Sequence, residues 1–189
     1  HPEFSFDGFR VTPFGPPPPI DVMAIRPKMT SLAARLGDGI SISVGASRAY
    51  IRDTVALVER ELGEAGRNRA SYRIVAMAIG VVSTDLEAAC GPLRAMLAMF
   101  PQTTAEYLAR GVMAPGSLVE AEKQGPMAVM KMWSAEAIEQ IALVSTPETL
   151  AGALRCYADT GIDELALVLL GDPDAQSEIV RRLAAARPT

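Results

Sequence analysis

The chain has 189 residues, of which 49% are hydrophobic, and carries a formal net charge of -4 at pH 7. This length corresponds to about one domain, and the apolar content is sufficient to bury a core. The acidic balance argues against general nucleic-acid binding, which needs concentrated positive charge, and no apolar run reaches the roughly 18–20 residues of a membrane span.

The first part of the chain reads as an extended connection followed by two strand–helix units. Residues 1–19 are rich in aromatic residues and proline, and four consecutive prolines there favour polyproline II. The pattern then predicts a strand at residues 20–25, a helix opened by Pro27 at its first position, and a second strand at residues 40–44. Ser47 suits the N-cap of the next helix, which an apolar stripe extends to Gly66.

A third strand follows at residues 74–82, where nearly continuous apolar residues are typical of a strand covered on both faces. Thr84 and Glu87 fit a capping box, which predicts a helix to about residue 100 with a disturbance at Gly91-Pro92. Residues 101–145 interrupt the alternation of strands and helices, and their pattern predicts short helices at 104–110, 117–124, 127–133 and 135–143.

The regular alternation returns near the end of the chain. Thr146 and Pro147 predict a helix start, with the helix running to Gly161. A strand at residues 164–170 and a final helix at about 174–186 complete the pattern; Asp172, Pro173 and Asp174 are expected to cap that helix.

Strands that alternate with helices indicate parallel β–α units with right-handed crossovers. Four predicted strands do not close a TIM barrel, which uses eight strands and typically about 250 residues. The predicted fold is therefore α/β, with residues 20–189 forming half of a barrel and a helical insertion at about 101–145 before the last strand.

The stretch PIDVMAIRPKM places Arg26, Pro27 and Lys28 where a buried strand meets a helix. One interpretation is a solvated loop. The other is an anion-binding corner, because a helix N-terminus favours negative charge and two cations there are easier to understand when a bound anion offsets them.

Two stretches resemble a known family. PIDVMAIRPKMTSLAARLGDGISISVGAS resembles the central signature of the luciferase-like oxidoreductases, in particular the branch that uses the deazaflavin coenzyme F-420. LVSTPETLAGALRCYADTGIDELALVLL is similar to the last helix–strand unit of that family, and FDG at residues 6–8 suits the preceding connection. The resemblance implies the C-terminal half of a TIM barrel and hydride transfer between F-420, or FMN in some relatives, and a small organic substrate.

The resemblance also implies that two strand-end loops contact the cofactor phosphate, since such loops carry the site in barrels of this kind. Many relatives have glycines where Ile25 and Arg26 stand, which lets backbone amides approach the phosphate. Either the guanidinium of Arg26 binds the phosphate in their place, or the site has changed to bind something else. For the second loop, an ordinary strand-end turn is the alternative. The implied cofactor-binding residues are Ala24, Ile25, Arg26 and Pro27 in the first loop and Ser43, Val44 and Gly45 in the second.

No catalytic residue is assigned, because the family's residues around the reactive ring come mostly from the N-terminal half. The only histidine is His1, which argues against histidine-based metal sites and Ser-His-Asp catalysis, and no metal is expected. Cys90 and Cys156 are expected to be buried and reduced, which, with no secretory signal pattern, predicts a cytoplasmic protein.

Six methionines in and around the insertion, together with Trp133, are interpreted as adaptable core packing, with an apolar lid or substrate wall as the alternative. They are Met96, Met99, Met113, Met127, Met130 and Met132.

A second hypothesis for the whole chain is a non-catalytic interaction protein. A half barrel exposes two sheet edges and an apolar face, which must be paired or covered. The partner is then a second copy, in a homo-oligomer, or the missing N-terminal half; the chain begins at His1 rather than methionine, which indicates that upstream residues were removed. An unrelated α/β binding domain is a third reading, favoured if the sheet proves to be doubly wound.

Overall fold

The structure is a computed structural model that describes residues 15–170 and 173–185. Residues 15–20 form exposed irregular backbone before the first strand. The rest of the predicted connection, the FDG stretch and Asp172 lie outside the described residues.

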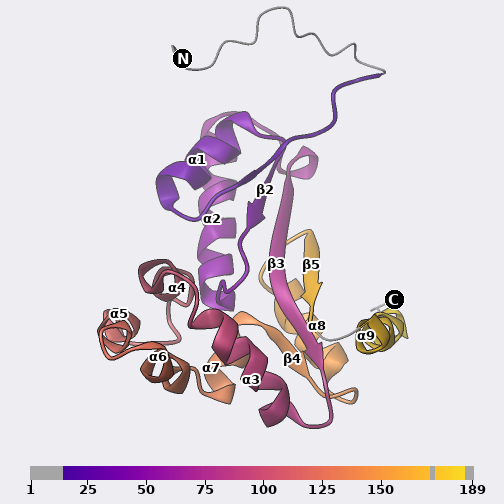
Figure 1. Cartoon of the computed structure of the whole chain (residues 1–189). Coiled ribbons are helices and arrows are strands. Elements are labelled where there is room, and N and C mark those ends of the chain that lie inside the picture. The colour runs from indigo at the N-terminus through magenta and orange to yellow at the C-terminus, as the bar shows by residue number, and fades with distance from the viewer. Residues whose placement is uncertain (1–14, 171–172, 186–189) are drawn as a thin grey trace, which may run out of the picture.

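Five parallel strands of the described chain form one sheet with β3 at its centre (Figure 1). Ala76 of β3 pairs with Ile42 of β2 and with Leu165 of β5, so those two strands lie at opposite edges of β3. Further along β3, Gly80 pairs with β4 and β5. The strands are β1 (Asp21–Met23), β2 (Gly39–Ile42), β3 (Arg73–Val82), β4 (Leu143–Ser145) and β5 (Glu164–Leu169).

Strands β2 and β4 therefore share one edge of β3, while β5 runs along the other. Apart from the short β4, the strands β1, β2, β3 and β5 lie side by side in chain order. A barrel has this order, whereas a doubly wound sheet reverses its order part-way. The predicted half-barrel architecture is confirmed.

The helices divide into those that alternate with strands and those of the insertion. In Figure 1 the insertion helices gather at the end of the molecule toward which the β3 arrow points. The alternating helices are α1 (Pro27–Leu36), α2 (Arg48–Glu64), the short 3-10 helix η1 (Arg69–Ser71), α8 (Leu150–Ala158) and α9 (Pro173–Ala185). The predicted insertion at 101–145 contains α4 (Gln102–Leu108), α5 (Ser117–Glu122), α6 (Pro126–Met132) and α7 (Ala135–Ile141). Helix α3 (Leu86–Leu97) precedes it, packs against α6 and α7, and is counted with the insertion from here on.

Local chemistry sets the first helix boundaries as predicted. Pro27 opens α1, and the hydroxyl oxygen of Ser47 caps α2 by accepting a hydrogen bond from the N–H of Tyr50 at 3.0 Å. Helix α2 ends with Gly66 at φ +66°, where the N–H groups of Gly66 and Arg67 bond back to Gly63 and Leu62. This is the Schellman arrangement, for which glycine is favoured because it adopts positive φ without strain.

Two predicted helix starts were wrong. Helix α3 is capped by the carboxylate of Asp85, which accepts from the N–H of Ala88, and not by Thr84. Helix α8 begins three residues after the predicted Pro147, because residues 146–149 close a turn in which the N–H of Thr149 donates to the carbonyl of Thr146.

The predicted helix over residues 135–143 ends early, and a strand that was not predicted follows it. All three residues of β4 are buried, and Val144 pairs with Val81 at the end of β3. Tertiary pairing with β3 thus overrides the helical pattern of the preceding residues.

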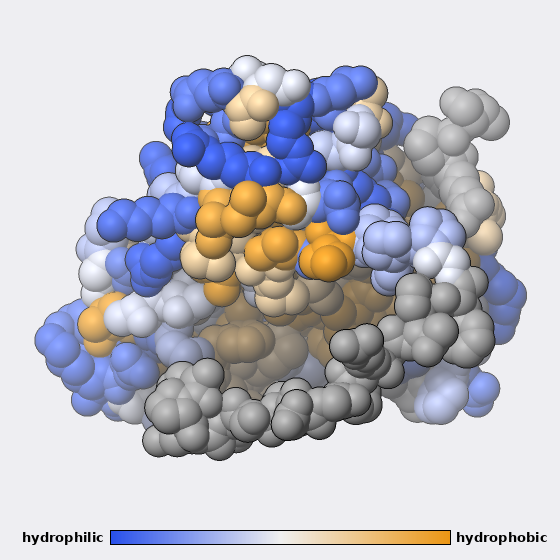
Figure 2. Space-filling model, turned by 90° about the horizontal axis from the view of Figure 1, so that it is seen from above, coloured by the Kyte–Doolittle hydropathy of each residue, from blue (hydrophilic) through white to orange (hydrophobic). Residues whose placement is uncertain are grey.

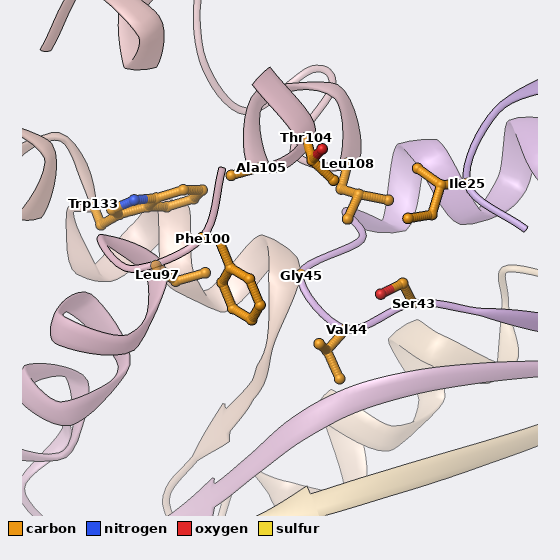
Figure 3. A pocket seen from close by; sticks show the side chains of 10 residues that line it. All are labelled: Ile25, Ser43, Val44, Gly45, Leu97, Phe100, Thr104, Ala105, Leu108 and Trp133. Atoms are coloured by element: carbon orange, nitrogen blue, oxygen red, sulfur yellow. The ribbon is translucent and has the colours of Figure 1, made fainter. Parts of the chain in front are cut away.

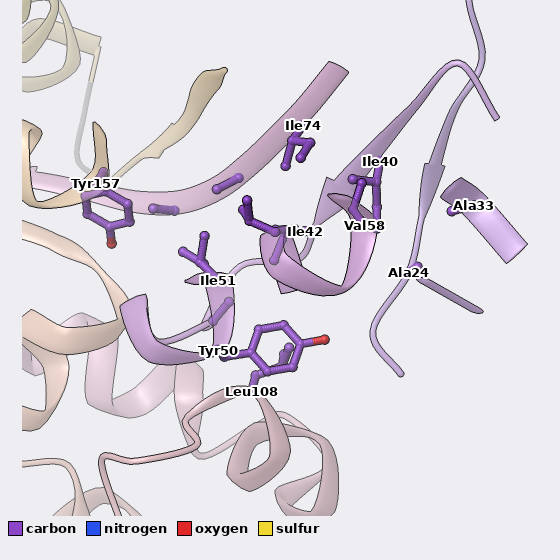
Figure 4. Packing of buried hydrophobic residues seen from close by; sticks show 14 of the residues in the cluster. Ala24, Ala33, Ile40, Ile42, Tyr50, Ile51, Val58, Ile74, Leu108 and Tyr157 are labelled. Atoms are coloured by element: carbon purple, nitrogen blue, oxygen red, sulfur yellow. The ribbon is translucent and has the colours of Figure 1, made fainter. Parts of the chain in front are cut away.

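The apolar core consists of two clusters. The first lies between the sheet and α1, α2 and α8; Figure 4 shows Ile40, Ile42 and Ile74 facing Ile51 and Val58 of α2. The second lies within the insertion, and joins Cys90, Leu93, Leu118 and Ile138 to Ile79 and Val144 of the sheet. The prediction that the cysteines are buried is confirmed for Cys90 and wrong for Cys156, which is exposed.

The face of the sheet away from α2 is open near both edges. Side chains alternate along a strand, so Val75 and Met77 project to the face opposite Ile74. On the edge strands, Met23 of β1 is 56% exposed and Val168 of β5 is 42% exposed. Among the described residues, no helix combines the length and apolarity needed to cross a bilayer.

Glu61 of α2 makes the packing of α1 on α2 dependent on pH. Its carboxylate accepts hydrogen bonds from Ser31 and Arg35 of α1, each at 2.8 Å, and these lower its pKa below the ordinary value of 4.5. A carboxylate with a lowered folded-state pKa stabilises the fold above its ordinary pKa and loses that contribution as the pH falls through the folded value. We expect Glu61→Gln to lower the free energy of unfolding in urea at pH 7, with the difference narrowing below pH 4.5. The exposed Glu122→Gln should match wild type throughout, and an equal loss in both variants would contradict this account.

Candidate functional site

The ends of β1 and β2 and the helix α4 of the insertion meet at one rim. Ala24, just past β1, is buried, and its N–H donates to the carbonyl of Ser41 at 3.3 Å. The carbonyl of Ile25 accepts a hydrogen bond from the hydroxyl of Tyr50. Burial raises the pKa of Tyr50 above its ordinary value of 10.0, which further favours the protonated hydroxyl that donates this bond.

Ser47 ties the insertion to this rim. It is 1% exposed, and besides capping α2 it donates its backbone N–H to the carbonyl of Leu108 at 2.8 Å. Its hydroxyl donates to the carbonyl of Arg110 at 2.7 Å. The end of α4 is therefore held against the start of α2, beside the two predicted loops.

A pocket of about 170 Å³ opens between the two loops and the insertion. Figure 3 shows Ile25 and Leu108 on one side, Leu97 and Trp133 on the other, and Phe100 between them. Ile25 and Leu108 belong to the first core cluster, whereas Leu97 and Trp133 belong to the second. The pocket thus lies at the seam between two separately packed cores. It is lined by Ile25, Ser43, Val44, Gly45, Leu97, Phe100, Thr104, Ala105, Leu108 and Trp133.

The lining is mostly apolar and contains no ionisable side chain. Its side-chain polar groups are the hydroxyls of Ser43 and Thr104 and the indole of Trp133, whose Nε1 is buried without a partner in the described part of the chain. Gly45 adopts φ +81°, and the space where a Cβ would stand has no atom within 4 Å. A ligand can therefore approach the backbone at Gly45.

Arg26 lies on the adjoining side of α4. Its guanidinium carbon stands 4.7 Å from the centre of the Tyr107 ring, and Tyr107 packs edge-on against Tyr50 at 5.6 Å. Within the described residues Arg26 has no carboxylate partner, and its side chain is exposed. Pro27 borders a second pocket of about 100 Å³ there, which Tyr107 also lines.

The structure therefore brings together four of the seven predicted cofactor-binding residues at one pocket: Ile25, Ser43, Val44 and Gly45. Ala24 is buried beside them, and Arg26 and Pro27 lie around the next side of α4. Sequence reasoning missed the contributions from α3, α4 and the connection between them, which are Leu97, Phe100, Thr104, Ala105 and Leu108.

The one signal for this wall was the cluster of methionines around Trp133. Trp133 does line the pocket, but none of the six methionines does. Met99, Met127 and Met132 are exposed, so the core-packing interpretation is wrong for these three.

The family model described as luciferase-like monooxygenase matches residues 1–164. The chain belongs to the luciferase-like monooxygenase family. No curated protein sequence matches it.

Solved structures of similar fold include three proteins whose names state a cofactor. The coenzyme F-420-dependent tetrahydromethanopterin reductase of Methanopyrus kandleri is 18% identical at a TM-score of 0.65, with 85% of this chain covering 48% of that one. An F-420-dependent secondary alcohol dehydrogenase is 19% identical at a TM-score of 0.65, with coverages of 90% and 49%. A riboflavin lyase with modified FMN is 18% identical at a TM-score of 0.61, with coverages of 98% and 46%.

The chain thus spans about half the length of these structures, and at such identities the likeness concerns the fold. The predicted family and half-barrel fold are confirmed. The roles of the two loops stay a prediction.

Replacing Ser47 tests whether it holds the rim together. Ser47→Ala removes a helix cap and leaves the carbonyl of Arg110 without its donor, so we expect a loss of about 2 kcal/mol in the free energy of unfolding by urea. The matched control is Ser134→Ala, since Ser134 caps α7 from an exposed position and makes no tertiary bond among the described contacts. We expect that variant to lose about 1 kcal/mol or less. Equal losses would show that Ser47 acts as a cap alone.

Proposed function

We propose that this chain is the cofactor-binding half of a luciferase-like oxidoreductase, which transfers hydride between the deazaflavin F-420, or FMN, and a small organic substrate. Family membership supports the class of reaction, and the names of the similar structures support the choice of cofactor. F-420 is the first choice because two of those three names state it, and FMN is the alternative.

The observation that carries the proposal is the position of Arg26. A cation stands at the N-terminal end of α1, next to two loops that end neighbouring parallel strands, with an aromatic ring beside it and no carboxylate partner among the described residues. Phosphate oxygens form strong, charge-assisted hydrogen bonds with a guanidinium, and a helix N-terminus also favours an anion. The open approach to Gly45 on the neighbouring loop adds room at the same rim.

The rim fits the phosphate end of such a cofactor better than its ring system. A pocket of about 170 Å³ is close to the size that holds one benzene ring, so three fused rings do not enter it. When bound, the cofactor supplies the hydride chemistry. In this proposal Arg26 and the backbone of the two loops hold its phosphate at the rim, outside the apolar pocket, and orient the rest of the molecule.

Removing the charge of Arg26 tests the phosphate assignment. We expect Arg26→Ala to weaken F-420 and FMN binding by about ten- to hundredfold, because hydrogen bonds to a charged group contribute roughly 1.5–3 kcal/mol. The measurement is a fluorescence titration of the chain together with any residues that precede it in the natural protein. Riboflavin, which lacks the phosphate, should bind both proteins equally.

The matched control is Arg155→Ala, which removes an exposed arginine from the last turn of α8, at the other end of the strands. It should bind both cofactors as wild type does. Equal binding by the Arg26 and Arg155 variants would contradict the phosphate role, and no binding of either cofactor by wild type would overturn the proposed function.

A second function, as an interaction module, is favoured by the open face of the sheet. In the described chain β1 pairs only with β2, and β5 pairs only with β3, so each leaves one edge free. Met23 and Val168 are exposed on these edge strands. Figure 2 views the molecule from above Figure 1 and shows apolar residues in the middle of that surface. We propose that a second copy, or the missing N-terminal half, covers the open face of the sheet.

Sedimentation velocity tests the covering of the open face. We expect residues 1–189 alone to sediment as a dimer or larger, and Met23→Lys with Val168→Lys to shift the protein toward monomer, because buried lysines oppose an apolar contact. Met99→Lys is the control, since Met99 is 85% exposed in the insertion. A longer chain that carries the N-terminal half should assemble from fewer copies, because that half would already cover the open face. A well-folded monomer of the 189-residue chain, unchanged by the double substitution, would contradict the proposal.

A further inference from the structure

We infer that the pocket between the two loops and the insertion receives an uncharged, apolar group about the size of a benzene ring. The inference rests on the proposed function for one point only, namely that this group is part of the oxidoreductase's substrate. The size and chemistry of the pocket carry the rest.

The volume of the pocket sets the size of the group. An apolar cavity of about 150 Å³ in another protein binds benzene or xenon, and this one has about 170 Å³. Its lining is of the same kind, with Ile25, Leu97 and Leu108 as aliphatic walls. A six-membered ring or a short branched alkyl group therefore fits, whereas a fused ring system does not.

The lining also sets the charge of the group. No described residue that lines the pocket has an ionisable side chain, so an ion placed there would lose its hydration and gain only neutral hydrogen-bond donors, which is costly. The hydroxyls of Ser43 and Thr104 supply hydrogen bonds for a polar atom attached to the group. The guanidinium of Arg26 lies over the Tyr107 ring, on another side of α4 from the pocket, so it does not compensate a charge inside the pocket.

Small residues keep the pocket open. Ala105 of α4 is 7% exposed and lines it, so a larger side chain at this position would occupy the space. Phe100 also lines the pocket but is 39% exposed, which makes it the part of the lining most accessible from solvent. We expect Ala105 to limit the size of the group and Phe100 to lie at the entrance.

The pocket contains its own reporter. Trp133 is the only tryptophan of the chain, is 1% exposed, and lines the pocket. Its fluorescence therefore reports occupancy without cofactor or turnover. We propose a titration with bromobenzene, whose heavy atom quenches a contacting indole, and expect quenching that saturates.

Two substitutions and one charged probe test the size and the charge. Ala105→Leu adds three carbon atoms to the pocket wall and should weaken bromobenzene binding by about tenfold or more. Displacing even two buried carbon groups of the ligand costs about 1.6 kcal/mol, which corresponds to that ratio. Ala95→Leu makes the same change at an exposed position of α3 and should leave binding unchanged. 4-Bromobenzoate, which adds a charge, should bind at least about tenfold more weakly than bromobenzene to wild type.

A second variant covers the case in which Ala105→Leu does not fold, as judged by circular dichroism. Leu97→Ala enlarges the pocket and should gain saturable quenching by 1-bromonaphthalene, which wild type lacks. The inference would be overturned by quenching of wild type that rises linearly with bromobenzene, or by equal bromobenzene binding in Ala105→Leu and Ala95→Leu. It would also be overturned if Leu97→Ala gained no saturable quenching by 1-bromonaphthalene, or if wild type bound 4-bromobenzoate as tightly as bromobenzene. These results are independent of the cofactor titration at Arg26, so the failure of one proposal is distinguishable from that of the other.

Discussion

The rim of this half barrel depends on the buried side chain and backbone of Ser47. One residue caps α2 through Tyr50 and holds the carbonyls of Leu108 and Arg110. Helix α4 has only seven residues, which is too short to be stable without tertiary contacts. Its position beside the strand ends therefore follows from these bonds and from apolar packing. Both the pocket and the contact between Arg26 and Tyr107 depend on that position, because α4 forms a wall of each.

Sequence reasoning succeeded where a structure is determined by neighbouring residues. Pro27, Ser47 and Gly66 set helix ends through backbone conformation and bonds within one turn, and all three act as predicted. It failed where contacts with residues distant in the sequence determine the secondary structure. Nothing near Val144 distinguishes the end of a helix from a strand; the difference comes from pairing with Val81, more than sixty positions earlier. The short β4 could therefore not be predicted from local pattern, although the parallel β–α order that defines the half barrel could.

The candidate site divides in the same way. The loops after β1 and β2 could be expected to meet, because carboxyl ends of adjacent parallel strands share one edge of a sheet. The structure does place Ile25 and Gly45 at one pocket. Leu97, Phe100 and Ala105 could not be assigned to that pocket, since they lie on α3, on α4 and between them, and no local pattern fixes how these segments pack on the sheet. Two cores that pack separately leave space where they meet, and the location of that seam is a property of the tertiary structure.

The contrast between the two sides of α4 shows how one half barrel can hold a charged group and an apolar one close together. Arg26 is held by an aromatic ring, and an exposed cation–π contact is worth about 0.5–1 kcal/mol. Hydrogen bonds from a guanidinium to a charged partner are worth roughly 1.5–3 kcal/mol, so a phosphate at the rim would compete successfully with Tyr107 for Arg26. A carboxylate in the place of Tyr107 would instead have neutralised the cation and opposed the anion. The aromatic contact therefore leaves Arg26 without a competing carboxylate among the described residues, beside a pocket whose own lining is apolar. In the proposed function, this arrangement would separate recognition of the cofactor's anionic end from recognition of an apolar substrate group.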